Sequence, residues 1–469
     1  MPSVLGFLLA AGLVARADEM GRSGYATMLP RHTTPVDDSG FYGAFIDPTN
    51  GYAYFFGNWL YKLDIKGDLP VPVGTAINTG GSSYFDIDPA AGYAYIMRST
   101  LNRYALGAGT NSITAAGTLA LNAGPPSAIF VDNSDPQPTN HYAYVFCKTN
   151  SHPTRITKIA LGTFTELPSY ASLNAGETNS GSCLGDAATG YIYFATRAAG
   201  DTNARIVKIQ MTPGTNVAQR IGSVNLGATE EGIGFGSLDS VHGYAYYGTY
   251  GSTNLPSRVY KVKLGESNAA PSLVGHIDLA QGRAQLSLSV LDSVNGFVYF
   301  GNDNTFPGGV HQFSLNGTNL PIEVRYLQCL GGPSNNPPDA TSAFNYTTNS
   351  DGILPYGEVY FRSAVFDPVR GNAYFGQDSR PCQVVKVHLA QLYPVNFQSP
   401  QKTNGGGFQC WFTNIMGANF SVLAATNLTL SASNWTSLGS VTDSPPGQYK
   451  FTDASATNRA QRFYRISAP

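Results

Sequence analysis

The sequence predicts an all-β fold, a seven-bladed β-propeller followed by a small C-terminal β-sandwich. Three observations lead to this prediction: a turn motif recurs seven times, strand-like segments follow each copy, and the composition favours strands. Charged residues make up only 12% of the 469 residues, about half of the ~25% that is usual in soluble proteins. Aromatic residues reach 12% and suit a pleated surface, while a hydrophobic content of 42% argues against disorder.

The N-terminus has the pattern of an export signal. Residues 4–14 form an apolar run that is too short to span a bilayer, and Ala15-Arg16-Ala17 offers the small-x-small pattern that signal peptidase cleaves. No Lys or Arg precedes the run, so a buried N-terminal strand is the alternative. We expect residues 1–17 to be a signal peptide and the mature protein to be secreted, extracellular or at the cell surface. No later segment is apolar enough to suggest a membrane span.

The turn motif reads Asp-Pro-x-x-Gly-Tyr-Ala-Tyr in its first copy and returns with small changes along the chain. The copies begin at Asp47, Asp88, Asp132, Asp186, Asp239, Asp292 and Asp367. Their spacings are 41, 44, 54, 53, 53 and 75 residues, so the period is about 50 with one long insertion. Asp and Pro favour a tight turn and Gly accepts positive φ at its exit. Each copy therefore predicts a β-hairpin, which has an expanded turn in the third copy.

Two further strands are predicted after each hairpin. The third contains a recurring apolar-Lys-apolar pattern, as in residues 206–209 and 384–387, and the fourth closes most units, as in residues 71–77. Four short antiparallel strands repeated about every 40–55 residues are typical of a β-propeller. A β-helix would need a shorter period, and a string of sandwiches would need a longer one.

The seventh unit lacks a fourth strand of its own, because residues 384–387 run almost directly into Pro394. Without a fourth strand, the third strand of this unit would be left as an unpaired sheet edge. Residues 25–36 precede the first innermost strand at the spacing of a fourth strand, so we expect them to pair with the third strand of the last unit. Pro30 and Pro35 are tolerable there, since an outermost strand uses one side of its hydrogen-bond ladder. The propeller is thus assigned to residues 18–392.

The phrases Asp-Pro-x-x-Gly-Tyr-Ala-Tyr-Phe-Gly and Val-Val-Lys-Val-x-Leu resemble those of bacterial seven-bladed propellers of the YVTN and NHL-like kind. This resemblance covers residues 25–390 and implies a fold but no particular function. Residues 393–469 resemble a small β-sandwich found on exported proteins of environmental bacteria, through Trp435, the Phe451-Thr452-Asp453 segment and the Arg-Phe-Tyr-Arg ending. That resemblance implies a role in attachment. Trp411 and Trp435 are the expected anchors of its core.

Propeller geometry sorts the connections into two faces. The tight Asp turns and the connections between third and fourth strands share one face, here called the turn face. The connections between second and third strands and those that link blades share the other, the loop face, where their lengths vary widely. Variable polar loops on a rigid scaffold often carry recognition. The candidate ligand-binding residues are Glu177, Glu230, Glu231, Arg283, Glu358 and Arg362.

Several of these residues, Glu177, Glu230, Arg283 and Glu358, come just before an innermost strand, so we expect them near the propeller axis. Asp303 is a further charged residue of this face. The alternative interpretation is that all of them are ordinary solvated loop charges, since charged side chains are mostly exposed.

No catalytic motif, metal site or cofactor is predicted. The five cysteines have no Cys-x-x-Cys spacing, and isolated buried thiols are expected. Of the seven histidines only His152 lies in a loop of the loop face, which disfavours a His-based metal site or general base. A formal net charge of −2 gives no reason to expect a nucleic-acid partner.

A basic residue recurs at one register of the third strands. These residues are Lys62, Arg103, Lys158, Lys208, Lys261 and Lys386. A linear basic patch is one interpretation. The favoured one is that each side chain lies along its blade and reaches polar groups at the edge, because the ring would separate the charges.

The leading hypothesis is a secreted, non-catalytic binding or adhesion protein whose loop face recognises an extracellular protein or carbohydrate. One rival is an extracellular propeller hydrolase or lyase, lactonase-like or acting on polysaccharide, that uses carboxylates and a divalent cation near the central channel. A purely structural envelope component is the third. Convergence of two or more of the candidate glutamates would favour the enzyme, and their dispersal would favour binding.

Overall fold

The structure is a computed structural model. It describes residues 20–27, 40–81, 84–148, 153–178, 180–196, 204–227, 233–250, 256–279, 285–303, 308–315, 317–328, 361–378, 383–389, 395, 397–414, 420–428, 430, 434–441, 447–458 and 461–467. These residues form seven four-stranded and two three-stranded antiparallel sheets, which confirms the all-β prediction. Within the described ranges, no helix is long and apolar enough to cross a membrane.

The four-stranded sheets follow the seven repeats in order, and we call each a blade. The strands are given from the innermost outward. Blade 1 contains β2 (Gly43–Asp47), β3 (Tyr52–Phe56), β4 (Trp59–Asp64) and β5 (Val71–Asn78). Blade 2 contains β6 (Tyr84–Asp88), β7 (Tyr93–Met97), β8 (Leu101–Ala105) and β9 (Thr114–Leu119). Blade 3 contains β10 (Pro126–Asp132), β11 (Tyr142–Cys147), β12 (Arg155–Ala160) and β13 (Thr165–Ser172). Blade 4 contains β14 (Ser180–Asp186), β15 (Tyr191–Thr196), β16 (Ala204–Gln210) and β17 (Gln219–Gly227).

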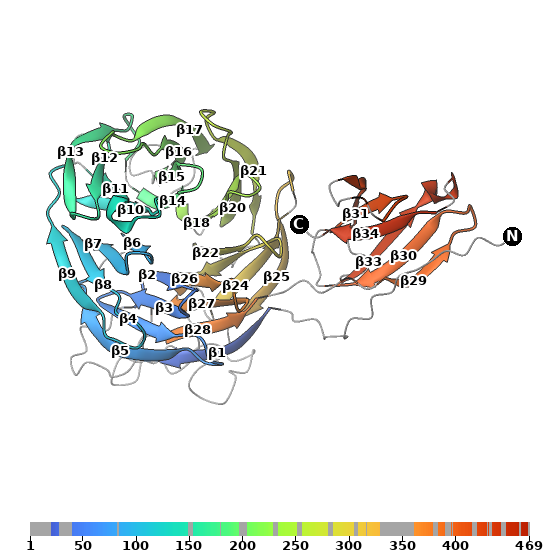
Figure 1. The fold of residues 1–469 in the computed structure, drawn as a ribbon, viewed down its shortest axis with the longest axis horizontal. Coiled ribbons are helices and arrows are strands. Elements are labelled where there is room, and N and C mark those ends of the chain that lie inside the picture. Colours follow the sequence, from blue (N-terminus) through green and yellow to red (C-terminus); the bar gives the residue numbers. More distant parts are fainter. Residues whose placement is uncertain are drawn as a thin grey trace.

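Blade 5 contains β18 (Ile233–Asp239), β19 (Tyr244–Thr249), β20 (Arg258–Lys263) and β21 (Ser272–Asp278). Blade 6 contains β22 (Leu286–Asp292), β23 (Phe297–Asn302), β24 (Gly309–Ser314) and β25 (Ile322–Gln328). Blade 7 contains β26 (Phe361–Asp367), β27 (Asn372–Gln377), β28 (Gln383–His388) and, as its outermost strand, β1 (Gly21–Thr27). The innermost strands contact one another in sequence and β26 contacts β2, so the blades close into a ring (Figure 1).

The ring is closed by a strand from the other end of the chain. β1 pairs antiparallel with β28, with Tyr25 opposite Val385 and Thr27 opposite Gln383. The sequence places this pairing within residues 25–36, but the strand begins upstream at Gly21, and residues 28–36 lie outside the described part of the chain. Pro30 and Pro35 are among these residues, so their place in the outermost strand stays a prediction.

The repeated turns form as their residues dictate. In the first, the backbone N–H of Gly51 donates to the carbonyl of Asp47 at 3.0 Å, and the Asp47 carboxylate accepts the N–H of Asn50 at 3.1 Å. Gly51 has φ of 70°, which a residue with a Cβ rarely adopts. The third copy has His141 in this place with φ of −71°, because its longer turn contains the 3-10 helix η1 (Pro138–Asn140) and needs no left-handed residue.

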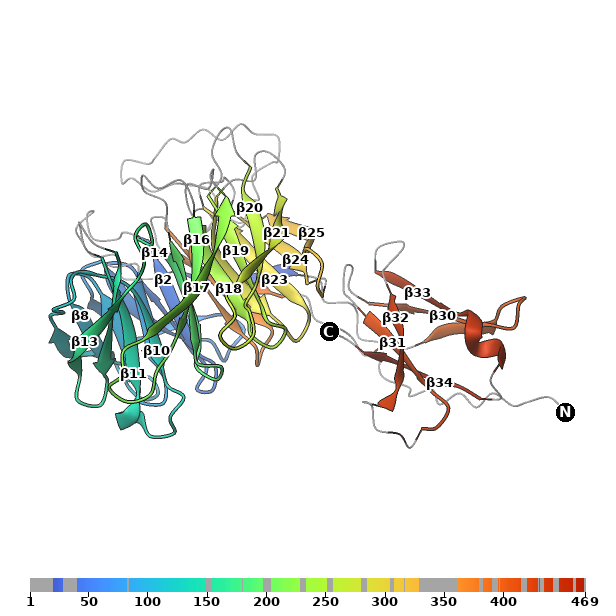
Figure 2. The same cartoon turned by 90° about the horizontal axis from the view of Figure 1, so that it is seen from above.

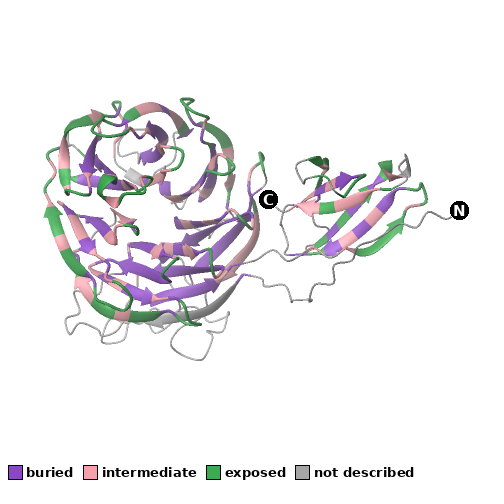
Figure 3. Ribbon diagram, in the orientation of Figure 1, coloured by how far each residue is buried: buried purple, intermediate pink, exposed green. Residues whose placement is uncertain are grey.

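Burial is greatest in the second strand of each blade and lowest in the outermost strand of blades 1 to 6 (Figure 3). All five residues of β3 are buried, whereas most of β5 is exposed or partly exposed. Aromatic rings fill the space between blades, as where Phe146 stacks on Phe194 at 4.4 Å. The core is therefore a series of interfaces between blades, as expected for a repeat architecture.

The C-terminal region consists of two small sheets that lie beside the propeller (Figure 2). One is β29 (Gln398–Lys402), β30 (Phe408–Thr413) and β33 (Gln448–Asp453), and the other is β32 (Thr436–Val441), β31 (Phe420–Ala425) and β34 (Phe463–Ser467), with the 3-10 helix η3 (Ala454–Asn458). In the core between these sheets, the ring centroid of Phe420 lies 5.2 Å from that of Phe412 and 4.9 Å from that of Tyr449.

The expected tryptophan anchors are not in this core. Trp411 and Trp435 are both only partly buried. Strand alternation explains Trp411, since its neighbours Cys410 and Phe412 point inward and Trp411 must then face outward, where Lys450 lies 4.8 Å from its ring. The prediction that tryptophans anchor the core was wrong.

Candidate functional site

The turn face is occupied by contacts between neighbouring blades. The Lys62 ammonium donates to the carbonyls of Leu106 at 3.1 Å and Gly107 at 2.6 Å, in the turn that follows the third strand of blade 2. It also lies 4.4 Å from the ring of Tyr52. A charge-assisted hydrogen bond and a cation–π contact thus connect blade 1 to blade 2.

The same contact recurs around the ring. Arg103 donates to Leu161, Lys158 to Thr212 and Gly214, Lys208 to Gly265, Ser267 and Ala269, Lys261 to Gly317 and Asn319, and Lys386 to Asp68, in each case to a backbone carbonyl of the next blade. Burial lowers the pKa of Lys158 to about 8. The favoured interpretation of these residues is confirmed, with the refinement that the polar groups belong to the neighbouring blade.

Blade 6 is the exception, and its position explains why. Gln312 stands opposite Tyr299, where the other blades place Lys or Arg. The chain after β28 does not turn back into a fourth strand, because that strand is β1. Among the described residues of blade 7, none after β28 forms a turn into a fourth strand, which is where the other blades supply their carbonyls to the preceding lysine.

Glu177, the first candidate residue of the loop face, forms a buried ion pair with Arg220. Its side chain is 1% exposed, and Arg220 of β17 donates to its carboxylate through Nε at 2.8 Å and through Nη2 at 2.5 Å. The backbone N–H of Asn174 donates to the same carboxylate at 2.9 Å. The hydrogen bonds to Glu177 raise the pKa of Arg220. Because β17 is the outermost strand of blade 4, the carboxylate pairs with the outer part of the blade, which differs from the expected position near the axis.

Arg362 on β26 is held by two carboxylates of the loop face. Its Nε donates to Asp303 at 3.0 Å, its Nη1 pairs with Asp378, and its guanidinium lies 5.6 Å from the ring of Tyr42. Burial alone would lower the pKa of Arg362, but the two aspartates outweigh it and raise the pKa. We call Arg362, Asp303, Asp378 and Tyr42 the Arg362 cluster.

The Arg362 cluster connects three blades. Asp303 follows β23 of blade 6, Asp378 follows β27 of blade 7, and Tyr42 precedes β2 of blade 1. The Asp378 carboxylate also accepts the backbone N–H of Gly40 at 3.0 Å. A Cβ on Gly40 would lie 2.0 Å from the Cα of Asp378, so only glycine allows this approach.

The structure brings together few of the predicted site residues. Glu177 and Arg362 lie in different parts of the ring and do not meet. Glu230, Glu231, Arg283 and Glu358 fall outside the described residues. Arg362 and Asp303 were both expected as charged residues of this face, but nothing in the sequence predicts that they pair.

A cavity of about 260 Å³ opens at the inner wall of the propeller, between the innermost strands of blades 2 to 5. Aromatic rings and three polar side chains line it: Tyr84, Phe85, Phe130, Phe235, Asp86, Ser182 and Cys183. Burial raises the pKa of Asp86 to about 7. Burial first, and Asp86 second, raise the pKa of the Cys183 thiol well above its usual value. Asp86 was not among the predicted site residues, although one signal in the sequence marks it: a carboxylate replaces the apolar or small residues found at this register in the other blades.

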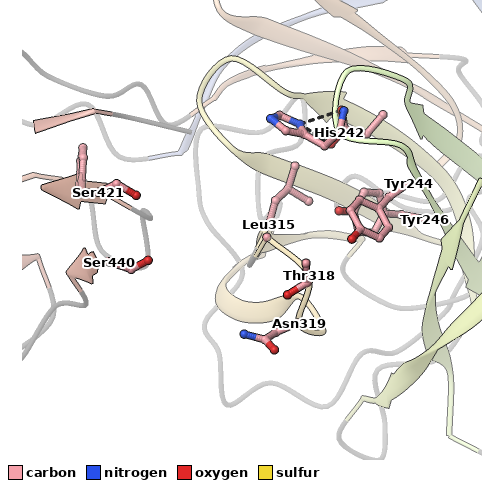
Figure 4. A pocket seen from close by; sticks show the side chains of 11 residues that line it. His242, Tyr244, Tyr246, Leu315, Thr318, Asn319, Ser421 and Ser440 are labelled. Carbon is pink, nitrogen blue, oxygen red and sulfur yellow. Dashed lines mark hydrogen bonds and ion pairs between the residues drawn. The ribbon is translucent and has the colours of Figure 1, made fainter. Parts of the chain in front are cut away.

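A second cavity, of about 490 Å³, lies between the turn face of blades 5 and 6 and the C-terminal sheets. In Figure 4, Ser421 and Ser440 of the C-terminal sheets lie across from Thr318 and Asn319 of the propeller. The propeller side uses Tyr244, whose ring lies 4.0 Å from the Lys261 ammonium. Blades 1, 3 and 4 contain the same Tyr–Lys pair. The propeller side of this cavity is therefore part of the repeated structure of the blades.

Metal-ligating groups do not gather in the described part of the chain. No set of three or more His, Cys, Asp or Glu side chains among these residues could hold a metal ion. Cys147, Cys183 and Cys410 are free thiols.

Comparison with known proteins shows the fold. No family model matches the chain, and no curated protein matches it. Similar solved structures include the β-propeller domain of Cps50 (Swd1) from Myceliophteria thermophila, with 8% identity over 79% of this chain and 100% of that chain and a TM-score of 0.53. Hydrazine synthase from Kuenenia stuttgartiensis has 9% identity over 76% of this chain and 98% of that chain, with a TM-score of 0.55.

A candidate 6-phosphogluconolactonase from Bacteroides uniformis is also similar, with 12% identity over 72% of this chain and 89% of that chain and a TM-score of 0.50. At such identities the likeness establishes a β-propeller and says nothing about activity. Membership of the YVTN or NHL-like families stays a prediction.

Proposed function

We propose that this protein is a secreted, non-catalytic binding protein whose loop face recognises an extracellular protein or carbohydrate, while the C-terminal region serves attachment. The observation that carries the proposal is the Arg362 cluster. It places a cation, two carboxylates and an aromatic ring on the loop face, and it connects three blades of a rigid ring.

The Arg362 cluster has the properties of a recognition site. Among the described residues, only Nε and Nη1 of Arg362 are engaged, and the side chain is 36% exposed. The remaining donors can reach carbonyl, carboxylate or hydroxyl oxygens of a ligand, since a guanidinium has five N–H donors in a fixed plane. Tyr42 adds an aromatic ring next to it. Because Asp303 and Asp378 fix the guanidinium, a ligand would lose little entropy in ordering it.

The test combines binding with product analysis on the full-length protein. We expect the protein to bind at least one member of an array of glycans and immobilised extracellular proteins, without releasing products from lactones or polysaccharides in the presence of divalent cations. Arg362→Ala should weaken that binding at least tenfold. Arg98→Ala, which removes an exposed arginine after β7 on the same face, is the matched control and should leave binding unchanged.

Two outcomes would contradict the proposal. Cation-dependent product release would favour the hydrolase or lyase. Binding that is equally strong in Arg362→Ala and the parent protein would remove the loop face around Arg362 as the recognition site.

A further inference from the structure

The cavity at the inner wall contains one residue that departs from the repeat. Asp86 lies opposite Tyr95 in the pairing of β6 with β7, two residues before the turn aspartate of its blade. The residues at the same register, opposite the corresponding tyrosines of the other blades, are Phe45, Phe130, Leu184, Ser237, Val290 and Val365. A carboxylate therefore replaces a side chain that is apolar or small everywhere else in the ring.

Asp86 has no cationic partner among the described residues. Its oxygens accept one backbone N–H each, from Ile87 at 2.8 Å and from Val131 of the next blade at 2.6 Å. The nearby Asp88 has the same charge and is itself paired with His141 at 2.6 Å. When Asp86 is ionised, the cavity therefore contains a negative charge that no Lys, Arg or His among the described residues balances, which is unfavourable in a partly enclosed site.

The other walls suit a cation that carries carbon. The aromatic residues Tyr84, Phe130 and Phe235 line the cavity, and aromatic rings attract positive charge. Cys183 adds no charge, because burial keeps its thiol protonated. A hydrated metal ion would need several oxygen ligands and finds mainly rings instead. The volume of about 260 Å³ lies just below the range of roughly 300–1,000 Å³ for pockets of drug-sized ligands, so the occupant must be small.

We propose that this cavity binds a small organic ammonium ion, with the cationic nitrogen against Asp86 and the attached carbon groups against the aromatic rings. The site is separate from the Arg362 cluster and does not depend on the function proposed for the loop face. Asp86 and Cys183 both line the cavity and are both partly exposed, so a small solute can reach them.

The direct test compares two ligands of the same shape that differ in charge. Choline carries a trimethylammonium group, and 3,3-dimethylbutan-1-ol carries a neutral tert-butyl group in its place. Isothermal titration of the full-length protein at pH 8 should show choline binding at least tenfold more tightly than the alcohol. Equal affinity for the two ligands, or no choline binding, would overturn the proposal.

Two variants locate the site. Asp86→Asn should reduce choline affinity at least tenfold, whereas Asp68→Asn, which removes an exposed carboxylate on blade 1, should leave it unchanged. Because Asp86 also bonds to Val131 of the next blade, Phe235→Leu provides a second variant that keeps the carboxylate and removes one ring. It should weaken choline severalfold and leave the neutral alcohol nearly unaffected. Undiminished choline binding in either variant would place the ligand elsewhere and contradict the proposal.

Discussion

The two faces of the propeller are built from different kinds of residue. On the turn face, the same three types of residue recur from blade to blade: a turn aspartate, a second-strand tyrosine and a third-strand lysine. Lys62 and Lys208 thus make equivalent contacts three blades apart. On the loop face, as far as the structure describes it, the Arg362 cluster is found once, where blades 6, 7 and 1 meet, and the Glu177–Arg220 pair is also found once.

This difference separates stability from recognition. A contact repeated in nearly every blade maintains the ring and cannot mark one place on it. A cluster that is not repeated can instead form a binding site at one position on the ring. The Arg362 cluster lies where blades 6, 7 and 1 meet, next to the blade that is closed by β1. The exception on the turn face agrees with this view, because Gln312 replaces lysine in blade 6, and the next blade takes its outermost strand from β1.

Removal of β1 should have the largest effect, because it opens the ring. In a variant without residues 18–27, β28, which contains the fully buried Val384, Val385 and Val387, loses its hydrogen-bonded partner and becomes an edge strand. We expect a loss of at least about 3 kcal/mol in the free energy of unfolding, or loss of a single cooperative transition. Urea unfolding followed by circular dichroism measures both. An unchanged midpoint would show that the ring does not depend on its closing strand.

Truncation at the other end is the matched comparison. A chain that ends at residue 394 lacks the C-terminal sheets but keeps every strand of the seven blades. It should retain the propeller transition, because blades bury their core against one another. A chain of this length that no longer unfolds cooperatively would show that the C-terminal sheets complete the propeller core.

The sequence predicts repeated features well because each of them is local. Asp47, Gly51 and Tyr52 fix a hairpin through their own backbone preferences, so seven copies predict seven hairpins. The outward direction of Trp411 could not be predicted with the same security, because it depends on which side of β30 packs against the opposite sheet.

The candidate site was harder to predict because its contacts join distant parts of the chain. Arg220 lies 43 residues from Glu177, and the pairing of Arg362 with Asp303 spans 59 residues. No local pattern indicates either pair. Asp86 could have been found by aligning the repeats, since it is the only carboxylate at its register, but only the structure shows that no cationic partner lies near it among the described residues.

Loss of one repeated lysine should have a smaller effect than loss of β1. Lys208 is fully buried and donates to three carbonyls of blade 5, so Lys208→Met leaves those acceptors without their donor and removes the cation next to Tyr191. We expect a loss of about 2–3 kcal/mol in the free energy of unfolding, because hydrogen bonds to charged groups are each worth about 1.5–3 kcal/mol. Gln312→Met, at the same register in blade 6, should cost under about 1 kcal/mol. Equal losses in the two variants would contradict a role for the lysine contacts.

The smallest expected effect is a pH dependence at the one turn that departs from the repeat. His141 replaces the turn glycine, and its Nδ1 lies 2.6 Å from the Asp88 carboxylate of blade 2. Burial would lower the pKa of His141, but the hydrogen bonds to Asp88 and to the Asp135 carbonyl outweigh it and raise the pKa. The folded protein then holds this proton more tightly than the unfolded chain does. The resulting stabilisation is complete below the ordinary pKa of 6.5 and is lost as the pH rises through the higher pKa of the folded state.

The expected loss is about 1.4 kcal/mol for each unit by which the pKa of His141 is raised. Urea unfolding of the parent protein and of His141→Gln between pH 5 and pH 9 measures it, and the parent should lose stability relative to the variant as the pH rises. His242→Gln is the control, because His242 pairs with Asp239 in the equivalent turn of blade 5 but is 42% exposed, so solvent screens the pair. If His141→Gln and the parent protein keep the same difference at every pH, then His141 is neutral in the fold, and the expanded turn is stabilised by its backbone bonds alone.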